Sequence, residues 1–270
     1  MMAYILDQSK ALSSDNVYIT LSGAAIGNGW VDPFHQYAAA EAAYGHGIIG
    51  RAQLAALQDK EKECQAQLNL KRYTSPVCFN LLDEIVGQSY GSKSNFKVSQ
   101  YDVRQVESSR GSRTFPPGHK IIETYLGGKG SATGMSTETM NDALAAIHAT
   151  ESRKAGQIYE ECTNPPYDAL SHQDGLGVVN EVVQVLEHEK EGEEPIRLLF
   201  FNGVTDLICN HVGNELVLEE LPWKHRHDWI VAARSAWKSK SQAGDKISGY
   251  IKEYSNLLVS RIEFKGVQKL

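Results

Sequence analysis

The stretch FFNGVTDLICNHVGN, residues 200–214, decides the fold. The apolar run from Ile196 to Phe201 predicts a buried strand, and the Asn and Gly residues further on predict a turn followed by a helix. One carboxylate, Asp206, lies between them. Because ligands and catalytic groups gather where parallel strands end, Asp206 is a candidate for chemistry. Taken alone, the pattern favours an ordinary turn residue, since Asp side chains bond nearby backbone amides.

Composition limits the classes of protein to which this chain can belong. It has 270 residues, of which 41% are hydrophobic, and this is enough for a substantial core. The formal net charge of -6, without a stripe of Lys and Arg, argues against a nucleic-acid partner. No apolar run approaches membrane-spanning length, and residues 1–8 do not look like a signal peptide. We therefore expect a globular protein without a membrane or nucleic-acid partner.

The four cysteines, Cys64, Cys78, Cys162 and Cys209, are scattered and form no C-x-x-C pair. We therefore expect neither a metal site nor a cofactor. A bridge between Cys64 and Cys78 would join two helical segments in an oxidising compartment. Free buried thiols are the alternative, and the sequence leaves both open.

The order of the predicted elements indicates an α/β protein. Helical and strand-like patterns alternate near the two ends of the chain, and a mostly helical, loop-rich region separates them. This favours a doubly wound sheet with a cap insertion, divided into core 1–34, cap 35–170 and core 171–270. Strands are expected over 17–26, 196–201 and 257–262. Helices are expected over 1–12, 37–44, 52–70, 77–86, 176–187, 212–221 and 229–238.

A second candidate for chemistry is Ser89, in the G-x-S-x-G match of residues 87–91. Such a nucleophile elbow needs a buried strand before it, whereas residues 77–86 are spaced as a helix. We therefore favour a helix that ends at a Gly. A hydrolase using Ser89, Asp206 and either His225 or His227 stays as an alternative, although these two histidines fit a polar surface better.

Several short motifs stand out along the chain: GAAIGNGWVDP (23–33), the pair QY (36–37), YDVR (101–104), NGVTDLICN (202–210), VGN (212–214), LPW (221–223) and GYIK (249–252). In this order they resemble motifs of the serine carboxypeptidases, which have the α/β-hydrolase fold. The resemblance covers most of the chain, and it is weaker across the cap.

The resemblance implies a role for particular residues. Asp206 would be the acid of a Ser-His-Asp triad, and Ile208 and Cys209 would line the pocket beside it. Trp30 and Tyr37 would contact the residue before the scissile bond, and Tyr101 the leaving residue; the alternative for these aromatic residues is ordinary packing. The spacing of Cys64 and Cys78 is similar to that of a family disulfide. Cys162 matches a family cysteine whose usual disulfide partner would precede Met1.

The resemblance also implies a partner and a location. The substrate would be a peptide with a free C-terminus. Relatives work in the secretory pathway, the vacuole or lysosome, or outside the cell. A homodimer is left open.

The sequence departs from the family at the other two triad positions. The family's G-E-S-Y-A-G nucleophile motif would precede Met1, and its G-H-M-V-P motif is replaced here by residues 263–270, EFKGVQKL. Residues 202–204 also lack the first Asp of the family's G-D-x-D. We therefore expect a core truncated at both ends and no hydrolysis by this chain alone. A fragment of an active enzyme, an acyltransferase on the same scaffold and a non-catalytic binding protein remain alternatives.

Overall fold

The computed structural model describes residues 1–10, 19–88, 96–108, 113–114, 137–157, 164–189, 191–239 and 246–262. The chain divides into two compact units, which are treated one at a time. The larger combines residues 1–112 with 173–270, and the smaller is residues 113–172. The predicted division into core and cap at residues 34 and 170 stays a prediction.

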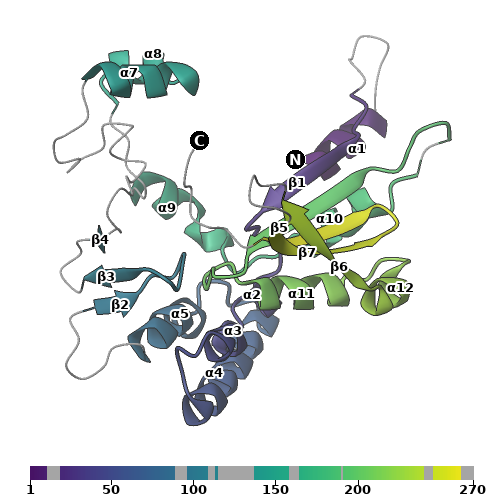
Figure 1. Ribbon diagram of the computed structural model, residues 1–270. Helices are drawn as coiled ribbons and strands as arrows, with labels where there is room; N and C mark the ends of the chain where they lie inside the picture. Colours follow the sequence, from purple (N-terminus) through teal and green to yellow (C-terminus); the bar gives the residue numbers. More distant parts are fainter. Residues whose placement is uncertain are drawn as a thin grey trace. The chain divides into compact units, whose positions relative to one another are not determined.

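The larger unit is built on a mixed five-stranded sheet (Figure 1). The first three strands in the sheet order are parallel, and the last two are antiparallel to their neighbours. Because β1, β5 and β8 run the same way, the turns that follow them meet at one edge of the sheet. The order is β1 (Gly23–Gly27), β5 (Arg197–Gly203), β8 (Leu257–Ile262), β7 (Lys246–Tyr254) and β6 (Arg234–Ser239).

Four helices share one apolar core with this sheet. Alternate side chains of β5 and β8 are fully buried and point to the same face, because side chains of paired strands alternate together. They pack in one cluster with apolar residues of the helices. The sheet contributes Leu198, Phe200, Leu257 and Val259. The helices are α1 (Met2–Lys10), α10 (Val179–Leu186), α11 (His211–Glu220) and α12 (Arg226–Val231).

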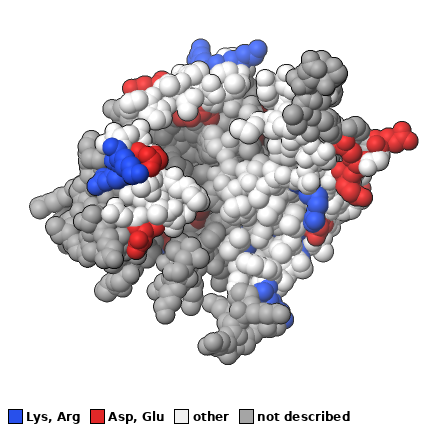
Figure 2. Space-filling model, turned by 90° about the horizontal axis from the view of Figure 1, so that it is seen from above, with Lys and Arg blue, Asp and Glu red and all other residues white. Residues whose placement is uncertain are grey.

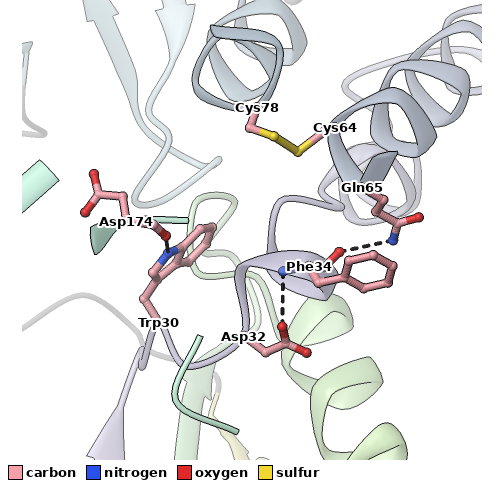
Figure 3. Close-up of a disulfide and its surroundings, with 7 residues drawn as sticks. All are labelled: Trp30, Asp32, Phe34, Cys64, Gln65, Cys78 and Asp174. Atoms are coloured by element: carbon pink, nitrogen blue, oxygen red, sulfur yellow. Dashed lines mark hydrogen bonds between the residues drawn. A yellow bond between two sulfur atoms is a disulfide. The ribbon is translucent and has the colours of Figure 1, made fainter. Parts of the chain in front are cut away.

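A second apolar cluster lies among the helices that follow β1. A disulfide joins Cys64 of α4 to Cys78 of α5, with a Cα–Cα distance of 4.9 Å (Figure 3). Further along the chain, β2 (Phe96–Val98) and β3 (Val106–Ser108) form an antiparallel pair. The helices are α2 (Pro33–Gln36), α3 (Ala40–Gly45), α4 (Arg51–Asn69) and α5 (Pro76–Gln88).

The smaller unit contains short elements. α7 and α8 contact each other, and His148 between them has a φ of 57°, which permits the sharp change of direction. The elements are β4 (Arg113–Thr114), α7 (Thr137–Ala146), α8 (Thr150–Lys154) and α9 (Asn164–Leu170); the 3₁₀ turn η1 (Ser171–Gln173) crosses the boundary between the units.

Two surface properties bear on the classes of partner. In the part of the chain that the structure describes, no helix combines the length and the apolar character needed to cross a membrane. On the face drawn in Figure 2, Lys and Arg are interspersed with Asp and Glu, and other residues lie between them.

Three sequence expectations are corrected by the structure. The helix expected over 229–238 is wrong, because α12 ends at Val231 and residues 234–239 form β6. Of the strand expected over 17–26, residues 17 and 18 lie outside the described residues, 19–22 are not in a strand, and β1 begins at Gly23, opposite Arg197, where pairing with β5 starts. The helix expected over 37–44 begins at Ala40, after the separate α2.

Candidate functional site

Asp206 lies in the turn after β5, three residues beyond the end of the strand. Its carboxylate is buried, with 6% of the residue exposed, and Oδ1 accepts a hydrogen bond of 3.0 Å from the Cys209 amide. The N-cap of α11 is a different residue, Asn210, whose side chain accepts from the Gly213 amide at 2.8 Å. Asp206 therefore stabilises its turn locally, as the pattern suggested, but it does not cap the helix.

Burial raises the pKa of Asp206 from 3.8 to about 6. The amides of Cys209 and Ile208 lower it in part, because they stabilise the charged form, and the negative charge of Asp102 raises it further. The group therefore changes charge in the mildly acidic range, unlike an exposed Asp.

Cys209 and Ile208 are half-buried next to this acid. Burial, and then the charge of Asp206, raise the pKa of the Cys209 thiol to about 12. A thiol that stays protonated at neutral pH is a poor nucleophile. The geometry thus suits a residue that lines a site and not one that attacks a substrate.

The loop over residues 99–105 is fastened to the Asp206 turn by its backbone. The Gln100 carbonyl accepts from the amides of Leu207 and Ile208, both at 3.0 Å. On the other side of Asp206, the Val103 amide donates to the Thr205 carbonyl at 3.0 Å. These bonds bring Tyr101, which is 46% exposed, to the same part of the molecule as Ile208 and Cys209.

Trp30 and Tyr37 meet in the turn after β1. Their rings make an edge-to-face contact with centroids 4.9 Å apart, and the Trp30 indole donates to the Asp174 carbonyl at 2.8 Å (Figure 3). In this turn Asn28 has a φ of 47°, in the left-handed region that Asn tolerates better than most residues. Both rings are half-buried.

A buried amide joins this turn to the helix that follows Asp206. Gln36 Oε1 accepts from the Val31 and Asp32 amides at 2.6 and 2.8 Å. Its Nε2 donates to the Gly29 carbonyl at 2.6 Å and to Asn214 Oδ1, on α11, at 3.1 Å. The turns after the neighbouring strands β1 and β5 therefore belong to one hydrogen-bond network. The sequence pattern did not reveal this role of Gln36 and Asn214.

A buried ionic cluster holds α11 against the sheet, and sequence reasoning missed it. Glu215 of α11 pairs with Arg261 at 2.5 Å, with Arg234, and with Lys252 at 3.4 Å; Lys252 is only 3% exposed. Burial raises the pKa of Glu215, but Arg261 and then Arg234 lower it more strongly, to about 2. Glu215 is therefore charged at all physiological pH values.

The structure also places the residues of the alternative triad. The ring of His225 packs against Trp223 and Tyr254, with centroids 5.4 and 5.7 Å apart. His227 is exposed on α12. Ser89, like Cys162 and residues 263–270, lies outside the described residues, so a triad that includes Ser89 stays a prediction.

No metal centre is found in the part of the chain that the structure describes, where no three His, Cys, Asp or Glu residues are grouped as ligands. The chemistry at this edge of the sheet comes from a buried carboxylate, a protonated thiol and aromatic rings. Such a carboxylate can accept a hydrogen bond and stabilise a neighbouring cation.

Comparisons with known proteins identify a family and a fold for this chain. A family model described as serine carboxypeptidase, Peptidase_S10, matches residues 1–266. Serine carboxypeptidase S10 family member 2 of Dictyostelium discoideum is 31% identical over 262 residues, which are 95% of this chain and 42% of that protein. The pheromone-processing carboxypeptidase KEX1 of Phytophthora infestans is 28% identical over 90% of this chain and 37% of that protein. The chain thus spans less than half the length of these relatives.

A solved structure is similar in fold. KEX1(delta)p, a prohormone-processing carboxypeptidase from Saccharomyces cerevisiae, superposes with a TM-score of 0.66. The match covers 97% of this chain and 54% of that one, at 22% sequence identity. It shows the α/β-hydrolase fold expected from the sequence.

Proposed function

Because the chain belongs to the serine carboxypeptidase family, we propose that it contributes the triad acid, Asp206, to an enzyme that releases C-terminal residues from peptides by acyl-enzyme chemistry. The observation that carries this proposal is the position of Asp206. It is a buried carboxylate at the carboxyl end of a parallel strand, and its turn is tied to those of Trp30 and Tyr101.

In this chemistry Asp206 would orient the histidine base and stabilise the imidazolium that forms during attack. It can do this only as a carboxylate. Since burial raises its pKa to about 6, we expect the acid to be fully effective only above that pH. The low local dielectric that raises the pKa also strengthens the bond to an imidazolium.

The surrounding residues suggest how a peptide would be held. Trp30 and Tyr37 would contact the residue before the scissile bond, and Tyr101 the leaving residue, beside Ile208 and Cys209. The proposed substrate is a peptide with a free C-terminal carboxylate. The disulfide between Cys64 and Cys78 supports an oxidising compartment, so we propose the secretory pathway or a vacuole or lysosome.

We propose further that the 270-residue chain has no peptidase activity by itself. Its sequence contains the orienting acid, but neither the nucleophile motif nor the G-H-M motif of the family. An orienting carboxylate can neither attack a carbonyl nor shuttle the proton of a serine.

The test compares two proteins in an assay with a free and a C-terminally amidated peptide. One is the 270-residue chain, and the other is the product of the complete transcript. If that product has both missing motifs, it should cleave only the free peptide. Asp206→Asn should lower its kcat by about 10⁴. Asp59→Asn, which changes an exposed Asp on α4, is the matched control and should have no effect.

Other outcomes would overturn these proposals. A complete transcript without the two motifs would make the protein a non-catalytic member of the family. Fluorophosphonate labelling of the 270-residue chain that disappears in Ser89→Ala would support the Ser89 hydrolase. Equal cleavage of the free and amidated peptides would exclude a carboxypeptidase.

A further inference from the structure

A second carboxylate lies beside Asp206 and is held by an arginine two residues away. Arg104 donates from Nε to Asp102 Oδ1 at 2.8 Å and from a terminal nitrogen to Oδ2 at 2.7 Å. The backbone amide of Arg104 adds a third bond, 3.1 Å to Oδ1. Three donors from one residue therefore fix this carboxylate, and the planar guanidinium matches it in a two-pronged pair.

The loop that carries this pair cannot easily move away from the acid. Its backbone bonds to the turn lie on both sides of Asp206, at Thr205 and at the amides of Leu207 and Ile208. Asp102 also hydrogen-bonds the side chain of Thr205, the residue next to Asp206. The fold thus places two carboxylates near each other at a largely buried position.

Two neighbouring carboxylates are unfavourable when both are charged, because each raises the free energy of ionising the other. Burial raises the pKa of Asp102, but the bonds and charge of Arg104 lower it more. Asp102 is therefore negatively charged over the pH range in which Asp206 titrates, and its effect on Asp206 depends on how completely Arg104 neutralises it.

We propose that Arg104 is a positioning residue for Asp206. By pairing with Asp102 it holds that carboxylate in place and offsets part of its negative charge near Asp206, and it holds the 99–105 loop on the Asp206 turn. The role of Asp206 as a triad acid rests on the proposed function. The electrostatic linkage among Arg104, Asp102 and Asp206 does not.

The other groups that bear on Asp206 do not replace this pair. Cys209, on the same turn, has a pKa of about 12 and carries no charge at neutral pH. The amides of Cys209 and Ile208 are fixed dipoles that do not titrate. Arg104 is 44% exposed on its side chain, so salt should weaken its effect without abolishing it.

The test is a titration of Asp206 in the 270-residue chain, which requires no catalytic activity. Aspartate labelled with ¹³C at the carboxyl carbon is followed by NMR from pH 3 to 8, and the Asp206 signal is assigned by its loss in Asp206→Asn. We expect Arg104→Gln to raise the midpoint of the Asp206 titration. Asp102→Asn should lower it, because the neighbouring charge is removed. In the Asp102→Asn background, Arg104→Gln should raise the midpoint less than in the unaltered chain, because only the direct effect of the Arg104 charge is lost and no Asp102 carboxylate is left unpaired.

Two more variants separate charge from structure. Arg104→Lys keeps the charge but not the planar fork, and it should keep the midpoint close to that of the unaltered chain. Arg197→Gln is the matched control, since Arg197 makes a looser surface pair with Glu253, 3.7 Å, at the opposite end of β5. It should leave the midpoint unchanged.

Three results would overturn the proposal. Arg104→Gln could leave the Asp206 midpoint unchanged. It could raise the midpoint equally with and without Asp102, which would mean that Asp102 is not the intermediary. Arg104→Lys could behave like Arg104→Gln while the chain stays folded, which would make the role of Arg104 steric. Lack of peptidase activity in the product of the complete transcript would contradict only the proposed function, because the titration of Asp206 does not depend on turnover.

Discussion

Two opposing requirements meet at Asp206. Burial strengthens the hydrogen bond between the Asp206 carboxylate and a catalytic histidine. Burial also favours the protonated carboxylic acid, which has no negative charge to stabilise an imidazolium. The sequence predicted the position of this acid, because a strand followed by a turn is a local pattern. It could not predict the pKa, which depends first on burial by the tertiary structure and last on the charge of Asp102, a residue about a hundred positions earlier in the chain.

The first prediction concerns the pH dependence of stability. The pKa of Asp206 is about 6 in the folded chain, against 3.8 for an unperturbed Asp, so between these values the folded state binds more protons than the unfolded state. Stability should therefore fall as pH rises from about 4 to 6. At about 1.4 kcal/mol for each pH unit, the buried charge costs roughly 3 kcal/mol above pH 6.

Urea unfolding of the unaltered chain and of Asp206→Asn from pH 4 to 7.5 tests this prediction. The variant should gain relative stability as pH rises to 6 and then keep a constant difference. Other titrating groups, such as Glu215, occur in both proteins and cancel in the difference. For Asp59→Asn, the difference in free energy of unfolding from the unaltered chain should not vary with pH. A difference that is likewise independent of pH for Asp206→Asn would contradict the prediction.

At the scale of elements, sequence periodicity predicted the helices and strands whose buried face is apolar. The helices α4 and α5 and the strand β8 were found for this reason. The strands β6 and β7 were not found, because the side chains that they turn toward α11 include Arg234 and Lys252. Lys252 is buried because it pairs with Glu215, and Arg234 pairs with the same carboxylate while staying partly exposed; a pattern of hydrophobicity cannot show such pairing.

The second prediction concerns Glu215. Replacement by Gln leaves Arg234, Lys252 and Arg261 without their shared carboxylate, so we expect a loss of about 3–5 kcal/mol at pH 7. The pKa of Glu215 is about 2 when folded and 4.5 when unperturbed. Its stabilisation is thus complete above pH 4.5 and is lost as pH falls toward 2, and the effect of the variant should shrink in that range.

Chemical unfolding at several pH values measures this effect. Glu220→Gln, which removes a surface partner of Arg226, is the matched control and should cost at most about 1 kcal/mol. A loss for Glu215→Gln no larger than that of the control would show that the cluster contributes little to stability.

The third prediction concerns Gln36, which connects elements that are far apart in the sequence. Its bond to Asn214 spans 178 residues, so a local pattern could not reveal it. Gln36→Met keeps a similar volume but leaves the amides of Val31 and Asp32 without a partner. We expect a loss of roughly 2–4 kcal/mol, since each unpaired buried group costs about 1–3 kcal/mol.

Urea unfolding also tests the Gln36 variant. Gln65→Met is the control, because Gln65 donates one bond, 3.1 Å, to the Phe34 carbonyl (Figure 3). Gln65→Met should lower the free energy of unfolding clearly less than Gln36→Met does. Equal losses in the two variants would mean that the four-bond network has no special role in joining the turns after β1 and β5.

At the scale of the whole molecule, the sheet has two different faces. The order of the predicted elements led to the expectation of a doubly wound sheet, and the apolar run Ile196 to Phe201 is typical of a strand covered on both sides. In the structure, Leu198 and Phe200 are buried under the helices, whereas Leu199 and Phe201 are half-exposed. Both faces of this strand carry apolar side chains, but how far each face is covered depends on tertiary structure, which a local pattern does not show.

The last prediction follows from this second face, where Leu199 and Leu258 pair across β5 and β8 beside a pocket of about 280 Å³. Half-exposed apolar side chains that adjoin one another favour dye binding and self-association. The 270-residue chain should therefore bind an apolar fluorescent dye and associate as its concentration rises.

The pair of changes Leu199→Thr and Leu258→Thr should reduce both signals while the circular dichroism spectrum is kept, because Thr suits a strand and exposes less apolar area. Leu198→Thr, on the covered face, should instead destabilise the fold by about 2–4 kcal/mol and increase dye binding. If the outer pair also increases dye binding, Leu199 and Leu258 belong to a covered core, and the two faces of the sheet are equivalent.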